Sequence, residues 1–239
     1  MKKIAFLFVS FALFSGAVVA QKTIDDATAE KRNVGSFHGI SVGTGIQLTL
    51  TAGASEEVAV SAATTEFRDK IVTTVENGIL KIMYESSKGS VNKKKETKDL
   101  RAYVSYKMLD QLDASTGARV KFNGVLNAGS LSMKASTGAI IDGEVAVSSL
   151  SLDQNTGSKV NLSGKTDKLT VEGSTGSKFE GEDMATTDCR IEVSTGAKAT
   201  VRAEKELQVK ASTGGNVRYK GDASIREIKT STGGSVSKI

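Results

Sequence analysis

The sequence has no proline and no tryptophan, only one cysteine and one histidine, and 5% aromatic residues. The lone Cys189 cannot form an internal disulfide, so packing alone must hold the fold. A core with so few aromatic side chains must be aliphatic. A serine nucleophile needs a base within reach, and the only histidine, His38, lies far from the serine-rich motifs in the segment FHGISV. We therefore interpret His38 as an ordinary strand residue.

The chain also lacks a strong charge of either sign and a long apolar segment. Two lysines, an eleven-residue apolar run and small residues at a cleavage position predict a secretory signal over residues 1–20, too short to span a bilayer. Removing those two lysines from the 32 Lys+Arg leaves 30 against 27 Asp+Glu, a net charge of +3. This balance does not favour nucleic acid as a partner. Because Gln21 and not cysteine follows the predicted cut, we expect a soluble exported chain without a lipid anchor or transmembrane segment, located in the periplasm, on the outer surface or outside the cell.

Glycine is abundant, with 24 residues, and much of it stands in a repeated Ser-Thr-Gly triplet. A degenerate copy, Asn155-Thr156-Gly157, fills the one gap in the series. The spacings between successive glycines are 21, 19, 19, 20, 18 and 19 residues for Gly117, Gly138, Gly157, Gly176, Gly196, Gly214 and Gly233. A period of about twenty residues is typical of a solenoid.

Alignment on the glycine gives two columns that are wholly apolar. Five residues before it stand Leu112, Met133, Leu152, Val171, Ile191, Val209 and Ile228. Three residues after it stand Val120, Ile141, Val160, Phe179, Ala199, Val217 and Val236. Seven residues before it the five middle copies are apolar, and Cys189 takes the place of a leucine there. The thiol is therefore predicted to be buried in the core.

Each copy reads as two strands of period two separated by a turn, and helical spacing does not fit. Such a strand pair can bury its inward side chains only against the next copy. The pattern predicts an all-β parallel β-helix with about 19–20 residues per rung and the triplet at one corner. Glycine supplies the positive φ of the corner, and we expect the Ser and Thr hydroxyls to bond the freed backbone groups and each other along the stack. The triplet lacks the aspartate of the calcium-binding nonapeptide repeat.

The first half of the chain shows the same register once, around Gly45 in ISVGTGIQLTL. Asn77-Gly78, between two alternating segments, predicts a type I′ hairpin. Residues 87–98 are expected to form an exposed lysine-rich loop, with an anion-binding finger as the functional alternative. We divide the chain into a flexible segment over residues 21–32 and a single β-helical domain over residues 33–239. That domain has an irregular capping region at 51–106 and regular rungs at 107–239.

The segments GISVGTGIQLTL, VENGILKI and LRAYVSYKMLDQLDASTGARVKFNG, with the Ser-Thr-Gly rungs that follow, resemble the head GIN domain family. This family is described as putative auto-transporter adhesins and occurs in exported bacterial proteins. The resemblance spans roughly residues 33–239. It implies a β-helical fold and an envelope or surface location, with no established enzymatic activity and no catalytic residues to carry over.

Two outward columns carry like charges at successive rungs and are our candidate ligand-binding positions. Four residues before the glycine, the acids are Asp153, Glu172 and Glu192; two residues after it, the bases are Lys159, Lys178 and Lys198. The plain interpretation is pairing of each acid with the lysine across the corner of its own rung. The functional alternative is a linear site for a charged polymer, with an anionic polysaccharide or cell-surface polymer as the partner.

We predict a non-catalytic, adhesin-like or structural protein of the cell envelope or surface. The alternative is a polysaccharide lyase or hydrolase that uses two stacked carboxylates about 5 Å apart. We assign no catalytic residue, no cofactor and no metal ligand. The sequence leaves the oligomeric state, the ligand and the handedness of the β-helix open.

Overall fold

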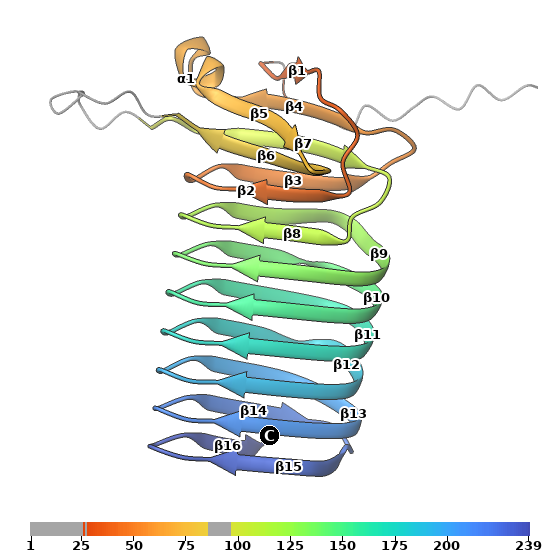
Figure 1. Ribbon diagram of the computed structural model, residues 1–239, viewed down its shortest axis with the longest axis vertical. Coiled ribbons are helices and arrows are strands. Elements are labelled where there is room, and N and C mark those ends of the chain that lie inside the picture. The colour runs from red at the N-terminus through yellow and green to blue at the C-terminus, as the bar shows by residue number, and fades with distance from the viewer. Residues whose placement is uncertain (1–25, 27, 86–96) are drawn as a thin grey trace, which may run out of the picture.

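The computed structural model describes residue 26 and residues 28–85 and 97–239, and Figure 1 shows a tall stack of β-rungs. Sixteen strands form one continuous sheet, and the only helix in the described part is the short α1 (Thr65–Asp69). The strands are β1 (Glu30–Arg32), β2 (Gly39–Val42), β3 (Gln47–Ala52), β4 (Glu57–Ser61), β5 (Ile71–Glu76), β6 (Ile79–Tyr84), β7 (Arg101–Tyr106), β8 (Gln111–Ala114), β9 (Arg119–Ala135), β10 (Ile140–Gln154), β11 (Lys159–Gly173), β12 (Lys178–Val193), β13 (Lys198–Ala211), β14 (Asn216–Lys220), β15 (Ser224–Thr230) and β16 (Ser235–Lys238). The prediction of an all-β solenoid is confirmed.

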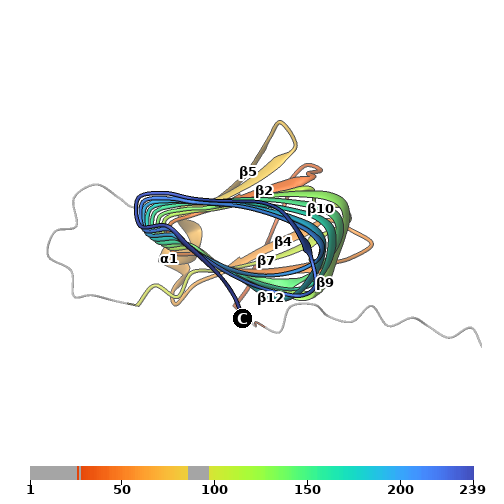
Figure 2. The same ribbon diagram turned by 90° about the horizontal axis from the view of Figure 1, so that it is seen from below.

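Each of the strands β9–β13 leaves one triplet corner, passes a second bend and reaches the next corner. Neighbouring rungs pair in parallel and in register over most of their length. We call the strand segments that lead into the triplet the entry face and those that leave it the exit face. Figure 2, which looks along the stack, shows the two faces meeting at a narrow corner and joined on the other side by a broader bend.

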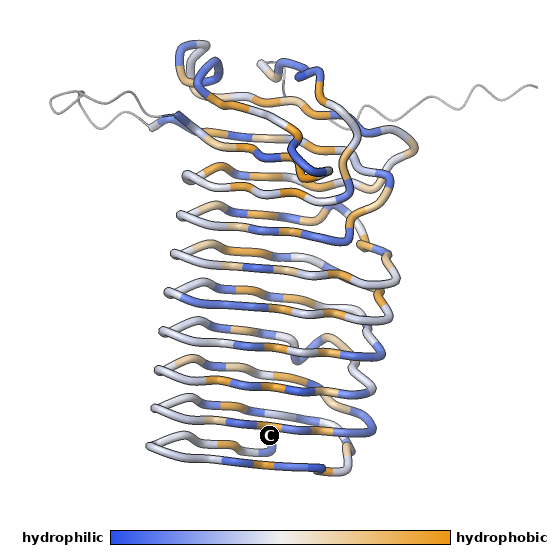
Figure 3. The backbone as a smooth tube through the Cα atoms, in the orientation of Figure 1, coloured by the Kyte–Doolittle hydropathy of each residue, from blue (hydrophilic) through white to orange (hydrophobic). Residues whose placement is uncertain are grey.

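The core lies between the two faces and is mainly aliphatic, as predicted. The column seven residues before the triplet glycine is in register from Leu131 to Leu207, and each of its side chains is buried. Cys189 stands in this column and is 4% exposed, and burial raises the pKa of its thiol to about 12. Figure 3 shows the alternation of apolar and polar residues along the rungs that produces this core. The prediction of a buried Cys189 is confirmed.

The triplet forms the corner of each rung as a two-residue turn with positive φ at both central residues. In one rung φ is 48° at Thr175 and 69° at Gly176, and Ser177 N–H donates to Ser174 O at 3.1 Å. This is the geometry of a type I′ turn. The prediction that the triplet forms a corner is confirmed. We had predicted a positive φ only for the glycine, but the threonine before it has the same left-handed conformation.

The predicted hydroxyl ladder at the corners is wrong. Backbone groups bond one turn to the next instead. Gly176 N–H donates to Thr195 O at 3.0 Å, and each corner from Gly45 to Gly214 forms the equivalent bond to the next corner along the stack. Among the described triplets the only hydroxyl hydrogen bond runs from Thr156 Oγ1 to Asn155 Oδ1. Stacked turns in register bring N–H and C=O groups directly together, so the backbone does not need side-chain acceptors.

The second bend absorbs the differences in spacing between triplets. The pairing of β9 with β10 shifts by two residues beside Asp142, and the pairing of β12 with β13 shifts at Gly181. These register shifts fall in rungs where the distance in sequence between successive triplet glycines differs from 19 residues. The corners and inward columns therefore stay in register although the rungs differ in length.

The N-terminal region lies at one end of the stack (Figure 1), and its order along the stack is not the order of the sequence. The rung of β2 and β3 lies between the β6–β7 rung and the β8–β9 rung. Beyond it, β5 pairs antiparallel with β6, and its turn at Asn77 (φ 51°) and Gly78 (φ 76°) confirms the predicted hairpin. On the exit face β4 and then β1 pair antiparallel.

Three further expectations concern segments that are described only in part. The signal peptide over residues 1–20 and most of the loop over residues 87–98 lie outside the described residues. The segment 21–32 was expected to be flexible, but its last three residues form β1 against β4. Asp26 accepts from Thr28 and from the Tyr103 hydroxyl at 3.0 Å, and these bonds, those to Thr28 foremost, hold the pKa of its carboxyl below the ordinary value.

Candidate functional site

The three lysines of the basic column lie side by side on the exit face. Lys159 is in register with Lys178, and Lys178 with Lys198, at the first residues of β11, β12 and β13. Their side chains project into solvent just after the triplet corner. Successive rungs of a parallel sheet are about 4.8 Å apart, so three ammonium groups share one short line. The predicted alignment of the column is confirmed.

Glu180 compensates two of these lysines. It stands in β12 two residues after Lys178, bonds that lysine directly, and lies 3.3 Å from Lys159 Nζ. The bond from Lys178 is the main cause that lowers the pKa of Glu180, and Lys159 adds to it. This carboxylate therefore bridges two rungs of the basic column.

The expected pairing of acid and lysine across the corner is wrong. No ion pair within the described residues joins Asp153, Glu172 or Glu192 to Lys159, Lys178 or Lys198. The physical reason is that the entry and exit faces lie on opposite sides of the core (Figure 2), so exposed residues of one face are separated from those of the other by buried side chains. Charges that flank a triplet in sequence are therefore on different faces.

Lys198 and Arg218 are basic groups at the C-terminal end of this face that no carboxylate of the described residues compensates. Arg119 and Lys121 are also unpaired among these residues, but β10 separates them from the lysine column. Lys198 begins β13, and Arg218 lies in β14, diagonally below it, since Lys198 pairs with Asn216 and Thr200 with Arg218. Both are exposed, and neither forms an ion pair with any described residue. Arg218 and Glu180 were not predicted, because the charged positions had been compared only in the column two residues after the glycine. The column four residues after the glycine holds both.

The acidic column lies on the entry face. Asp153, Glu172 and Glu192 are in register, with Lys134 on one side and Lys210 on the other. Lys210 Nζ is 3.8 Å from Glu192. The three carboxylates stand on an exposed sheet face and line neither of the two grooves described next.

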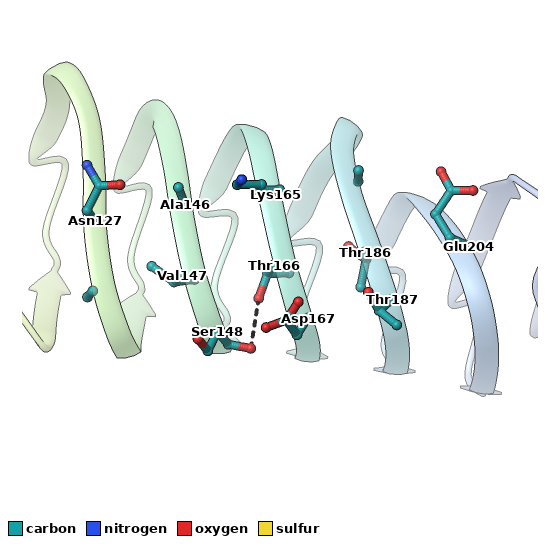
Figure 4. A pocket seen from close by; sticks show the side chains of 12 residues that line it. Asn127, Ala146, Val147, Ser148, Lys165, Thr166, Asp167, Thr186, Thr187 and Glu204 are labelled. Carbon is teal, nitrogen blue, oxygen red and sulfur yellow. Dashed lines mark hydrogen bonds between the residues drawn. The ribbon is translucent and has the colours of Figure 1, made fainter.

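A shallow groove of about 450 Å³ follows the second bend across several rungs. Figure 4 shows side chains of successive strands side by side along it, among them Lys165, Asp167 and Glu204, with Thr166 Oγ1 donating to Ser148 O. A second groove of about 350 Å³ lies on the exit face and includes Glu180. Both signs of charge line the first groove, so it selects for neither an anion nor a cation.

The remaining polar candidates among the described residues are His38 and the acidic side chains. His38 lies directly before β2, and its Nδ1 is 2.7 Å from Asp110 Oδ1, with both side chains partly exposed. Over residues 28–85 and 97–239 no three His, Cys, Asp or Glu side chains converge as metal ligands would. No helix of the described residues is long and apolar enough to cross a membrane.

These features define a β-solenoid that presents charged side chains in lines on flat faces. A family model described as "Putative auto-transporter adhesin, head GIN domain" matches residues 36–223, and the chain belongs to this family. No curated protein sequence matches it.

Solved structures confirm the fold at low sequence identity. A putative adhesin from Bacteroides fragilis has a TM-score of 0.80 at 14% identity, covering 91% of this chain and 99% of its own. A putative adhesin from Parabacteroides merdae gives 0.67 at 15%, covering 88% and 95%. A putative lipid binding protein from Parabacteroides distasonis gives 0.66 at 16%, covering 90% and 98%.

Proposed function

We propose that this protein is a non-catalytic, exported, adhesin-like protein that binds a linear anionic polymer along its exit face. The observation that carries the proposal is the line formed by Lys159, Lys178 and Lys198 at successive rungs. A polymer with a repeating negative charge can contact several rungs at once, and many weak contacts add up to useful affinity. The family to which the chain belongs supports the adhesin-like role.

The uncompensated basic groups are the ones that we expect to contribute most to the contact with the polymer. Lys198 and Arg218 have no carboxylate partner among the described residues, whereas Lys159 and Lys178 share Glu180. A ligand anion must displace Glu180 to reach these two lysines, which costs part of the contact free energy. We therefore assign the main contact to the C-terminal end of the column.

This proposal can be tested by measuring how much of the protein is retained on beads coated with polygalacturonate. Beads of neutral dextran serve as the reference. We expect retention of the native protein on the anionic beads only, and a loss on the order of ten-fold when Lys159, Lys178 and Lys198 become glutamine. The matched control replaces three lysines of the entry face, Lys134, Lys168 and Lys210, by glutamine. Equal retention of the two triple variants would contradict a role for the exit face, because both lose the same net charge.

A further inference from the structure

The two ends of the solenoid differ in how they close the core. At the N-terminal end β4, β1 and the β5–β6 hairpin cover it, and Val58, Val60 and Ile71 are each at most 3% exposed. At the C-terminal end the last rung is β15 with β16, and within the described residues no strand pairs with their outer edges. The family match stops at residue 223, directly before β15.

The apolar column continues into this last rung and is exposed there. Ile225 is 51% exposed and Ile228 is 39% exposed, whereas Leu207 and Val209, their partners in the rung above, are fully buried. Ile239, which follows β16 in the same rung, is 46% exposed. Three of the six large hydrophobic residues that are exposed in the described part thus gather at one end. An unpaired strand edge of seven residues that carries two exposed isoleucines is a template for pairing with another chain.

The two strands of the last rung are not equally suited to a contact. In β16 the inward position below Tyr219 is taken by Lys238, a charge of the kind that protects a sheet edge from association. In β15 the inward positions hold Ile225, Ile228 and Thr230. The contact therefore belongs to β15.

We propose that β15 pairs antiparallel with β15 of a second copy, about a twofold axis at Ile228, to give a tail-to-tail dimer. In this register Ile228 faces its own equivalent and extends the core across the interface. Glu227, which bonds Lys229 of its own chain, then also faces Lys229 of the other copy, and the twofold axis makes this opposite-charge contact twice. Moving the centre by one residue to Lys229 places two lysines opposite each other. Moving it to Glu227 places Ile228 opposite Arg226.

A second copy of this chain is the partner that we assign to the β15 edge, because the sequence of β15 is complementary to itself in that one register. Head-to-tail stacking does not offer the same match, since the N-terminal end is closed by antiparallel strands and α1. The dimer is independent of the polymer-binding column, because β15 carries none of its lysines. A result against one proposal leaves the other standing.

Sedimentation of the mature protein over a wide concentration range tests the association, and the expected species at high concentration is a dimer. Ile228→Lys should abolish it, and Val125→Lys, an equally exposed position away from the end, should leave it unchanged. Glu227→Lys alone or Lys229→Glu alone should weaken association roughly ten-fold, and combining them should restore it. A protein that is monomeric at every concentration would overturn the proposal.

Cross-linking tests the register even if a lysine at position 228 disturbs the last rung. Ile228→Cys should form a disulfide-linked dimer under mild oxidation, because paired residues of antiparallel strands approach to about 4.5–5.5 Å between Cα atoms. Glu227→Cys is the matched control, and it should stay uncross-linked because its equivalents lie diagonally apart. Cys189 is buried and does not compete. Preferential cross-linking through position 227 would show a different register and contradict the assignment.

Discussion

At the scale of single residues, the threonine of each triplet is the least expected feature. From Thr116 to Thr232 every one has φ between 46° and 51° and is exposed. A β-branched residue is disfavoured in this left-handed region, where asparagine is several-fold enriched. Because the hydroxyls bond almost nothing at the corners, hydrogen bonding does not account for the choice of threonine.

Thr175→Asn should therefore stabilise the protein, by about 0.5–1 kcal/mol, because it relieves backbone strain without removing a hydrogen bond. Urea denaturation monitored by circular dichroism measures the change. Thr170→Asn is the control, since Thr170 lies within strand β11 and the same substitution there should destabilise. If both variants lose stability equally, the left-handed threonines are not strained and contacts between stacked side chains hold them.

At the scale of elements, the second bend depends on a few glycines that are not equivalent. Gly124 and Gly164 both have positive φ, 92° and 103°. A Cβ on Gly124 would meet nothing within 4 Å, whereas one on Gly164 would lie 2.1 Å from Val145 O. The neighbouring rung therefore restricts the bend at Gly164 in a way that it does not at Gly124.

We expect Gly164→Ala to destabilise by about 3 kcal/mol and Gly124→Ala by about 1 kcal/mol, since both strain φ but only the first forces the rungs apart. Thermal and chemical denaturation of the two variants measures the difference. Equal losses would mean that the bend relaxes freely and that rung spacing does not constrain it.

At the scale of the whole molecule, the fold of the repeated half could be predicted from the sequence, whereas the strand order of the N-terminal half could not. The triplet, the apolar columns and Asn77-Gly78 are local patterns, and they predicted the corners, the core and the hairpin. The place of β2 and β3 between later strands depends on pairing between distant segments, which periodicity does not encode. The partners of Lys159 and Lys178 were missed because charges were compared across the corner and not along one face.

The proposed polymer binding depends on a line of three lysines that differ in how far Glu180 compensates their charge. Calorimetric titration with polygalacturonate at increasing salt concentration tests this claim most directly, using the native protein, Lys198→Gln and Lys159→Gln. Affinity should fall steeply with salt in the native protein, and the loss at low salt should be larger for Lys198→Gln, because Lys159 is already bound to Glu180. Binding that does not depend on salt, or a larger loss for Lys159→Gln, would contradict the account.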